Sequence, residues 1–138
     1  MSALRLPGTL CDSLIAFAQR GYPEESCGLL LGTQNGAERV VVSVRQARNL
    51  NVERAIDRYE LDPEDFLAAD REARAAGLDI VGVWHSHPDH PAEPSLTDLA
   101  GAWPGWSYVI IAVGTEGVSE IRCWELTRSN FQEEVIIR

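Results

Sequence analysis

Two histidines and one aspartate are spaced in the sequence so that they could bind one metal ion. His85 and His87 end an apolar run that starts at Asp79 and is typical of a buried strand. Because side chains two residues apart on a strand point to the same face, the two imidazoles should lie side by side. Asp98, on the first turn of a following helix, could add a carboxylate oxygen. These ligands leave a fourth tetrahedral position for water, as in catalytic zinc sites, where the metal lowers the pKa of water to about 7.

The same residues also allow a purely structural interpretation. An H-x-H pattern is common and is unspecific by itself. Ser95 and Asp98 also fit a capping box at a helix N-terminus, with Ser95 as the N-cap. The two interpretations are compatible, because a helix that starts at Ser95 can still direct Asp98 toward a metal.

The elements that must position these residues follow from hydrophobic patterning. The spacing of apolar residues predicts a helix over residues 8–21. Asp62 followed by Pro63 predicts the capped start of a second helix that runs to about Ala76. Residues 46–60 should be mostly loop, and a short helix should start at Ser95. Strands are expected at residues 27–32, 39–45, 79–87, 107–113, 118–126 and 131–137.

Together these elements predict an α/β fold with a single mixed central β-sheet flanked by two to three helices. Strand 79–87 is apolar on both faces, which favours a central position covered by helices. By length, residues 1–138 fit a single domain. Trp84 should point into the core, opposite the two histidines. Trp103 and Trp106 could shape a rim of the site, although a wall of the core is the default expectation, and His90 should be exposed.

Charge and cysteine content restrict the possible partners and location. The formal net charge is −9, which disfavours a nucleic-acid partner because phosphate backbones would be repelled. The sequence has no run of about 18 apolar residues, so we expect no membrane span. Cys11, Cys27 and Cys123 are widely spaced and form no C-x-x-C pair, so we expect reduced thiols in the core. The N-terminus shows no secretory leader pattern, and we expect a cytoplasmic protein.

Two motifs taken together resemble a known family. The first is H-x-H-P, then six residues, then S-x-x-D. It is similar to the JAMM signature of the MPN+ metalloproteases and is formed here by His85, His87, Pro88, Ser95 and Asp98. Upstream, residues 23–30 (PEESCGLL) resemble the family's Pro-x-Glu-x-Cys-Gly-Leu-Leu stretch and place its glutamate at Glu25. Asn49 and residues 58–63 also match, so the resemblance covers about residues 8 to 126.

The resemblance implies the MPN (JAMM) fold and a hydrolytic site. His85, His87 and Asp98 would hold one zinc ion per chain. Glu25 would act as general acid and base, taking a proton from the zinc-bound water and handing it to the leaving amine, while the adjacent Glu24 would be solvated. Ser95 would donate a hydrogen bond to the developing oxyanion.

The resemblance also implies a substrate. Members of this family cut bonds at the C-terminal tail of ubiquitin or ubiquitin-like proteins, and several small stand-alone bacterial members process sulfur carriers of that fold. It therefore implies a zinc peptidase or isopeptidase acting on such a tail, which we expect to add in extended form beside a sheet edge.

Two other functions are compatible with parts of the pattern. A non-catalytic MPN scaffold would have the same fold, but such modules typically lack a metal ligand. A RadC-like protein linked to DNA repair would carry a very similar second motif. The Glu25 motif and the negative charge favour the peptidase over both.

Overall fold

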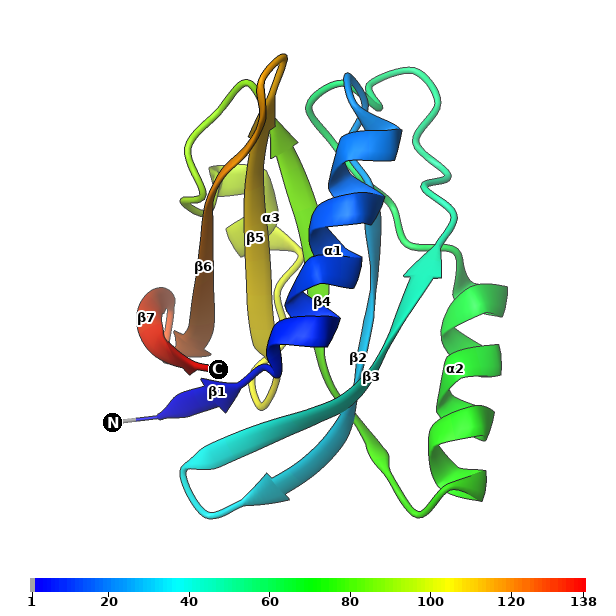
Figure 1. Cartoon of the computed structure of the whole chain (residues 1–138), viewed down its shortest axis with the longest axis vertical. Coiled ribbons are helices and arrows are strands. Elements are labelled where there is room, and N and C mark those ends of the chain that lie inside the picture. The colour runs from blue at the N-terminus through cyan, green and yellow to red at the C-terminus, as the bar shows by residue number, and fades with distance from the viewer. Residues whose placement is uncertain (1) are drawn as a thin grey trace.

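The computed structural model describes residues 2–138, which form a mixed β-sheet and three helices (Figure 1). The elements in chain order are β1 (Ala3–Arg5), α1 (Gly8–Gly21), β2 (Cys27–Asn35), β3 (Glu38–Ala47), α2 (Pro63–Ala75), β4 (Asp79–Pro88), α3 (Leu96–Ala100), β5 (Ser107–Gly114), β6 (Gly117–Thr127) and β7 (Asn130–Ile137). The predicted α/β class, with a mixed sheet and three helices, is confirmed.

The sheet closes on itself in the order β1-β3-β2-β4-β5-β6-β7. β4 and β5 run parallel, whereas β2 is antiparallel to both β3 and β4. The closure depends on β1, which pairs in parallel with β3 on one side and β7 on the other. Sequence patterning did not predict β1, because a strand of three residues is too short to show a period.

The three helices begin at or next to the predicted residues. α1 spans the predicted residues. α2 has proline in its first turn, and the side chain of Asp62 accepts a hydrogen bond from the Glu64 N–H at 2.9 Å. α3 follows Ser95, which forms both hydrogen bonds of a capping box with Asp98. No helix within residues 2–138 is long and apolar enough to cross a membrane.

Helices cover the central strand on both faces. α1 packs on one face (Figure 1). There Leu14 and Phe17 meet Trp84 and Val109. α2 packs on the other face, where its alanines meet the side chains of Leu29, Val83 and Tyr108 from the sheet. β4 is buried from Val81 to Pro88. This confirms the predicted central strand and the core position of Trp84. The three cysteines are free and buried, as expected.

A polar cluster lies inside the sheet near its closure. The Arg39 guanidinium forms ion pairs with Glu125 at 2.7 Å and Glu134 at 3.3 Å. The hydroxyl of Ser107 donates to Glu134 at 2.6 Å. Arg39, Ser107 and Glu134 are buried and Glu125 is partly exposed, and the cluster joins β3, β5, β6 and β7 by charge-assisted contacts.

Candidate active site

His85, His87 and Asp98 converge at the C-terminal end of β4, where α3 begins. The two histidine Nε2 atoms lie 3.0 Å apart. Asp98 Oδ2 is 3.3 Å from His85 Nε2 and 3.0 Å from His87 Nε2. Nitrogen and oxygen ligands about 2.0–2.1 Å from a tetrahedral zinc ion are roughly 3.3 Å from one another. The three atoms therefore have the spacing that one small cation requires, and they form a group that could hold a metal ion.

Hydrogen bonds orient His87 for ligation. Its Nδ1 lies 2.9 Å from the carbonyl oxygen of Pro91, so Nδ1 carries the proton and donates it. In the neutral ring, Nε2 is then an acceptor, and it faces the Asp98 carboxylate and the second imidazole. Such a cluster of acceptors needs a proton or a cation between them. A hydrogen bond from the other ring nitrogen to a backbone carbonyl is also typical of metal-ligating histidines.

The protonation tendencies of the group follow from burial and mutual contact. Burial lowers the pKa of His85, which favours the neutral, metal-binding imidazole. Burial also acts to lower the pKa of His87, but its hydrogen bonds to Asp98 and Pro91 outweigh burial and raise it. Burial acts to raise the pKa of Asp98, yet hydrogen bonds from both histidines and the Ser95 backbone hold that pKa well below its usual range. Asp98 is therefore held in its anionic form, which is the form that could bind a cation.

Glu25 lies beside this group with a buried, unsatisfied carboxylate. The residue is 7% exposed, and its Oε1 has no hydrogen-bond partner among the described residues. Burial raises the pKa of Glu25 to about 8. Its backbone is fixed on both sides, since its N–H donates to Ala55 at 2.5 Å and its carbonyl accepts from the Asn49 side chain at 3.2 Å. Glu24 is exposed, as expected.

Ser86 connects Glu25 to the histidine strand, a role that sequence reasoning did not assign. Its hydroxyl accepts the N–H of Ser26 at 2.8 Å, and its own N–H donates to the Ser26 carbonyl at 2.9 Å. Ser86 is fully buried between His85 and His87 in sequence. The sequence signal that could have indicated this role is the single hydroxyl side chain of Ser86 within the apolar run of β4. Tyr59 was also missed; its ring stacks on His85 with centroids 4.5 Å apart.

Ser95 forms the capping box that its motif predicts. Its hydroxyl oxygen accepts from the Asp98 N–H at 3.0 Å, and its N–H donates to Asp98 Oδ2 at 2.9 Å. The capping box thereby fixes the same carboxylate oxygen that faces the histidines. The hydroxyl hydrogen of Ser95 is not used in these contacts, and the side chain is exposed beside His87.

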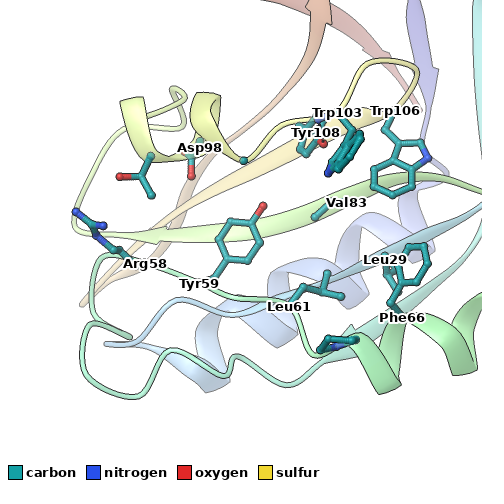
Figure 2. A pocket seen from close by; sticks show the side chains of 13 residues that line it. Leu29, Arg58, Tyr59, Leu61, Phe66, Val83, Asp98, Trp103, Trp106 and Tyr108 are labelled. Carbon is teal, nitrogen blue, oxygen red and sulfur yellow. Dashed lines mark hydrogen bonds between the residues drawn. The ribbon is translucent and has the colours of Figure 1, made fainter.

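Two cavities border the site. The first, here called the polar pocket, has a volume of about 380 Å³ and is lined by Glu25, Asp57, Arg58, His87, His90, Pro91, Glu93, Pro94, Ser95 and Thr97. The second, here called the aromatic groove, has a volume of about 700 Å³ (Figure 2). It is lined by Leu29, Arg58, Tyr59, Leu61, Pro63, Phe66, Val83, Thr97, Asp98, Gly101, Trp103, Trp106 and Tyr108.

The structure corrects one expectation about the tryptophans and restricts where a substrate tail could pair. Trp103 is 68% exposed on the aromatic groove, so its predicted place in a core wall is wrong. Trp106 packs against Phe66 and is partly buried, which is closer to the expected place in a wall of the core. β4 is paired with β2 and β5 on its two sides, so a substrate tail has no edge of the histidine strand to join. His90 is exposed, as expected, and lines the polar pocket without joining the metal-ligand group.

Comparisons with known proteins agree with this geometry. Residues 8–127 match the family described as prokaryotic homologues of the JAB domain. A protein of Haloferax volcanii named desampylase is 37% identical over 114 residues, which cover 79% of this chain and 80% of that protein. The CysO-cysteine peptidase of Mycobacterium tuberculosis is 30% identical over 128 residues, 92% of this chain and 85% of that protein. A solution structure of a Desulfitobacterium hafniense protein superposes with a TM-score of 0.86 at 30% identity, covering 97% of this chain and 91% of the other.

Proposed function

The chain belongs to the prokaryotic family of JAB-domain homologues, and we propose that it is a zinc-dependent peptidase or isopeptidase that cleaves at the C-terminal tail of a ubiquitin-like sulfur carrier. Its relatives carry the names of peptidases and conjugate-cleaving proteases, and the chain is a hydrolase of the JAMM type. We propose that residues 1–138 act as one catalytic domain in the cytoplasm.

The observation that carries this proposal is the placement of a buried, unsatisfied carboxylate beside three converging ligand atoms. Removing Glu25 Oε1 from water without a hydrogen-bond partner costs free energy. Proteins retain such a group where its altered proton affinity has a use. In this proposal, His85, His87 and Asp98 hold the metal, which would supply Lewis-acid activation of water and of the scissile carbonyl.

The side chains around the metal have distinct roles in the proposed reaction. Glu25 takes a proton from the attacking water and then delivers it to the leaving nitrogen as the C–N bond breaks and a C–O bond forms. A pKa near neutrality suits a group that must both accept and donate a proton. The Ser95 hydroxyl donates a hydrogen bond to the carbonyl oxygen as that oxygen gains negative charge.

Intact mass spectrometry of candidate substrates tests the proposal. Ubiquitin-like sulfur carriers from the same organism, each with its native C-terminal extension, are incubated with the protein. We expect trimming after the Gly-Gly end, and we expect both a chelator and Glu25→Gln to abolish it. The glutamine is close in size to glutamate, so this variant removes the proton transfer while leaving the three ligands in place.

Two results would refute the proposal. Trimming that persists with chelator and in Glu25→Gln would exclude the assigned roles. Failure of the chain to bind zinc would make His85, His87 and Asp98 structural and would favour the non-catalytic scaffold. Salt-dependent binding to DNA in a parallel titration would instead favour the RadC-like alternative.

A further inference from the structure

The two cavities meet at the metal-ligand group, but only one contains the proton donor. Arg58 and Thr97 line both cavities, and Asp98 lines the aromatic groove. Glu25 lines the polar pocket and is absent from the residues that line the groove. The cavities are therefore adjacent, share Arg58 and Thr97 in their walls, and differ in the chemistry of their other lining residues.

This asymmetry fixes the direction in which a substrate binds, if the proposed function holds. Glu25 must reach the leaving nitrogen to protonate it, so the leaving group must enter the polar pocket. The acyl part of the substrate, on the other side of the scissile carbonyl, then extends past Asp98 and Thr97 into the aromatic groove. We propose that the aromatic groove is a specificity site for large apolar side chains of the substrate tail that precede the scissile bond.

The walls of the groove explain why the occupant must be apolar. Its two charged residues, Arg58 and Asp98, lie at the end beside the metal ligands, and Trp106 and Phe66 lie at the far end (Figure 2). Between them Tyr59 points toward the α3 side. A charged side chain placed deep in the groove would lose its hydration without gaining a partner. Small residues suit the junction with the metal centre, and bulky apolar ones suit the far end.

Trp103 provides a second argument for an apolar ligand. It is 68% exposed and adjoins the apolar walls of the groove, so its indole extends an apolar surface that a ligand could cover. Its backbone N–H donates to the Tyr108 hydroxyl at 2.7 Å, which fixes the chain that carries the indole. Exposed tryptophans next to preformed pockets are typical anchors of binding sites. The groove volume also falls in the range of ligand sites.

Peptides that end in Gly-Gly test the groove by binding. One set carries leucine or phenylalanine at the positions before the glycines, and a matched set carries aspartate or alanine there. Binding is followed by intrinsic tryptophan fluorescence, with the protein as purified and again after chelation. We expect the apolar peptides to bind about 10- to 100-fold more tightly and to shift the emission to shorter wavelength.

Trp103→Ala and Leu96→Ala provide the matched variants. Leu96 is the first residue of α3 and is 86% exposed, and Trp103 follows α3 and is 68% exposed. Neither change should therefore unfold the protein. Only Trp103 lines the groove. We expect Trp103→Ala to remove the preference for apolar peptides and Leu96→Ala to preserve it. Equal binding of both peptide sets, or a preference that survives Trp103→Ala, would overturn the proposal.

Cleavage kinetics separate this proposal from the proposed function and test the direction of binding. Substrates are varied before the scissile bond in one series and after it in another. We expect Trp103→Ala to reduce kcat/KM selectively for apolar residues before the bond. An equal effect on residues after the bond would refute the assigned direction. If no substrate is cleaved but apolar peptides still bind through Trp103, the proposed function fails and the groove assignment stands.

Discussion

Replacing Ser86 with alanine tests how the two halves of the site are held together. The Ser86 hydroxyl accepts the N–H of Ser26, the residue directly after Glu25. Both serines are buried, so water cannot replace the lost acceptor. Leaving a buried donor unsatisfied costs about 1–3 kcal/mol. We therefore expect Ser86→Ala to lower both the stability of the protein and the precision with which Glu25 is placed.

The expected change in melting temperature follows from chain length. The entropy of unfolding is about 2.1 cal/mol/K per residue, or roughly 0.3 kcal/mol/K for 138 residues. A loss of 1–3 kcal/mol should then lower the melting temperature by about 3–10 °C. A shift of the carboxylate by about 1 Å can cost on the order of 100-fold in rate. We expect this loss in kcat, with KM nearly unchanged.

Thermal unfolding, steady-state kinetics and metal content are the three measurements. Ser13→Ala is the matched control, because its hydroxyl donates to Thr9 on the outer side of α1. We expect the control to change stability by less than about 0.5 kcal/mol. Metal content should stay at the wild-type level in Ser86→Ala, since His85, His87 and Asp98 are retained. A melting temperature and kcat equal to the control's would refute the reasoning.

Three further predictions follow from the same structure. Asp98→Asn should remove the bound metal, as measured by elemental analysis, and full metal content in the variant would contradict this. The circular dichroism spectrum should stay unchanged, because the asparagine side chain can still accept the Ser95 N–H. With the metal chelated, the free energy of unfolding should fall between pH 4.5 and about 8, since Glu25 stays protonated in the folded protein while the unfolded chain ionises. Glu25→Gln should flatten that part of the curve, and parallel curves would count against the raised pKa. Arg39→Met should cost about 3–5 kcal/mol in chemical denaturation because Glu134 stays buried without its cation, whereas Arg5→Met at an exposed ion pair should cost less than about 1 kcal/mol.

The helices and strands were predictable where local chemistry determines them. Asp62 and Pro63 mark the start of α2 regardless of the rest of the chain. The apolar run of β4 similarly indicates its central place. The closure of the sheet was not predictable, because β1 has no pattern of its own and forms only where β3 and β7 offer partners. The buried polar cluster was not predictable either. Glu133 and Glu134 are adjacent glutamates on opposite faces of β7, and the sequence does not show which of them points inward.

In the candidate site, too, local patterns predict some residue positions and long-range contacts determine others. The two-residue period of a strand brings His85 and His87 together, and the capping box brings Asp98 to them, so local rules suffice for the ligands. The position of Glu25 depends on contacts with Asn49, Ala55 and, through Ser26, Ser86, which are far from it in sequence. Only the folded chain reveals these contacts and the exposure of Trp103.

The parallel pairing of β1 with β7 has a consequence for rearranging the chain. Ala3 lies opposite Val135, and the Leu6 N–H donates to the Ile137 carbonyl at 2.7 Å. β1 and β7 therefore lie side by side, far from the arrowhead of β4 (Figure 1). Because β1 and β7 are parallel, Ile137 lies beside the end of β1, and a linker from it to Ala3 must run back along the length of β1. A circular permutant with a glycine linker of that reach, opened at the exposed turn at Gly36, should keep the same strand order. In that permutant β1 would be threaded directly after β7, and the metal ligands would remain in one uninterrupted segment.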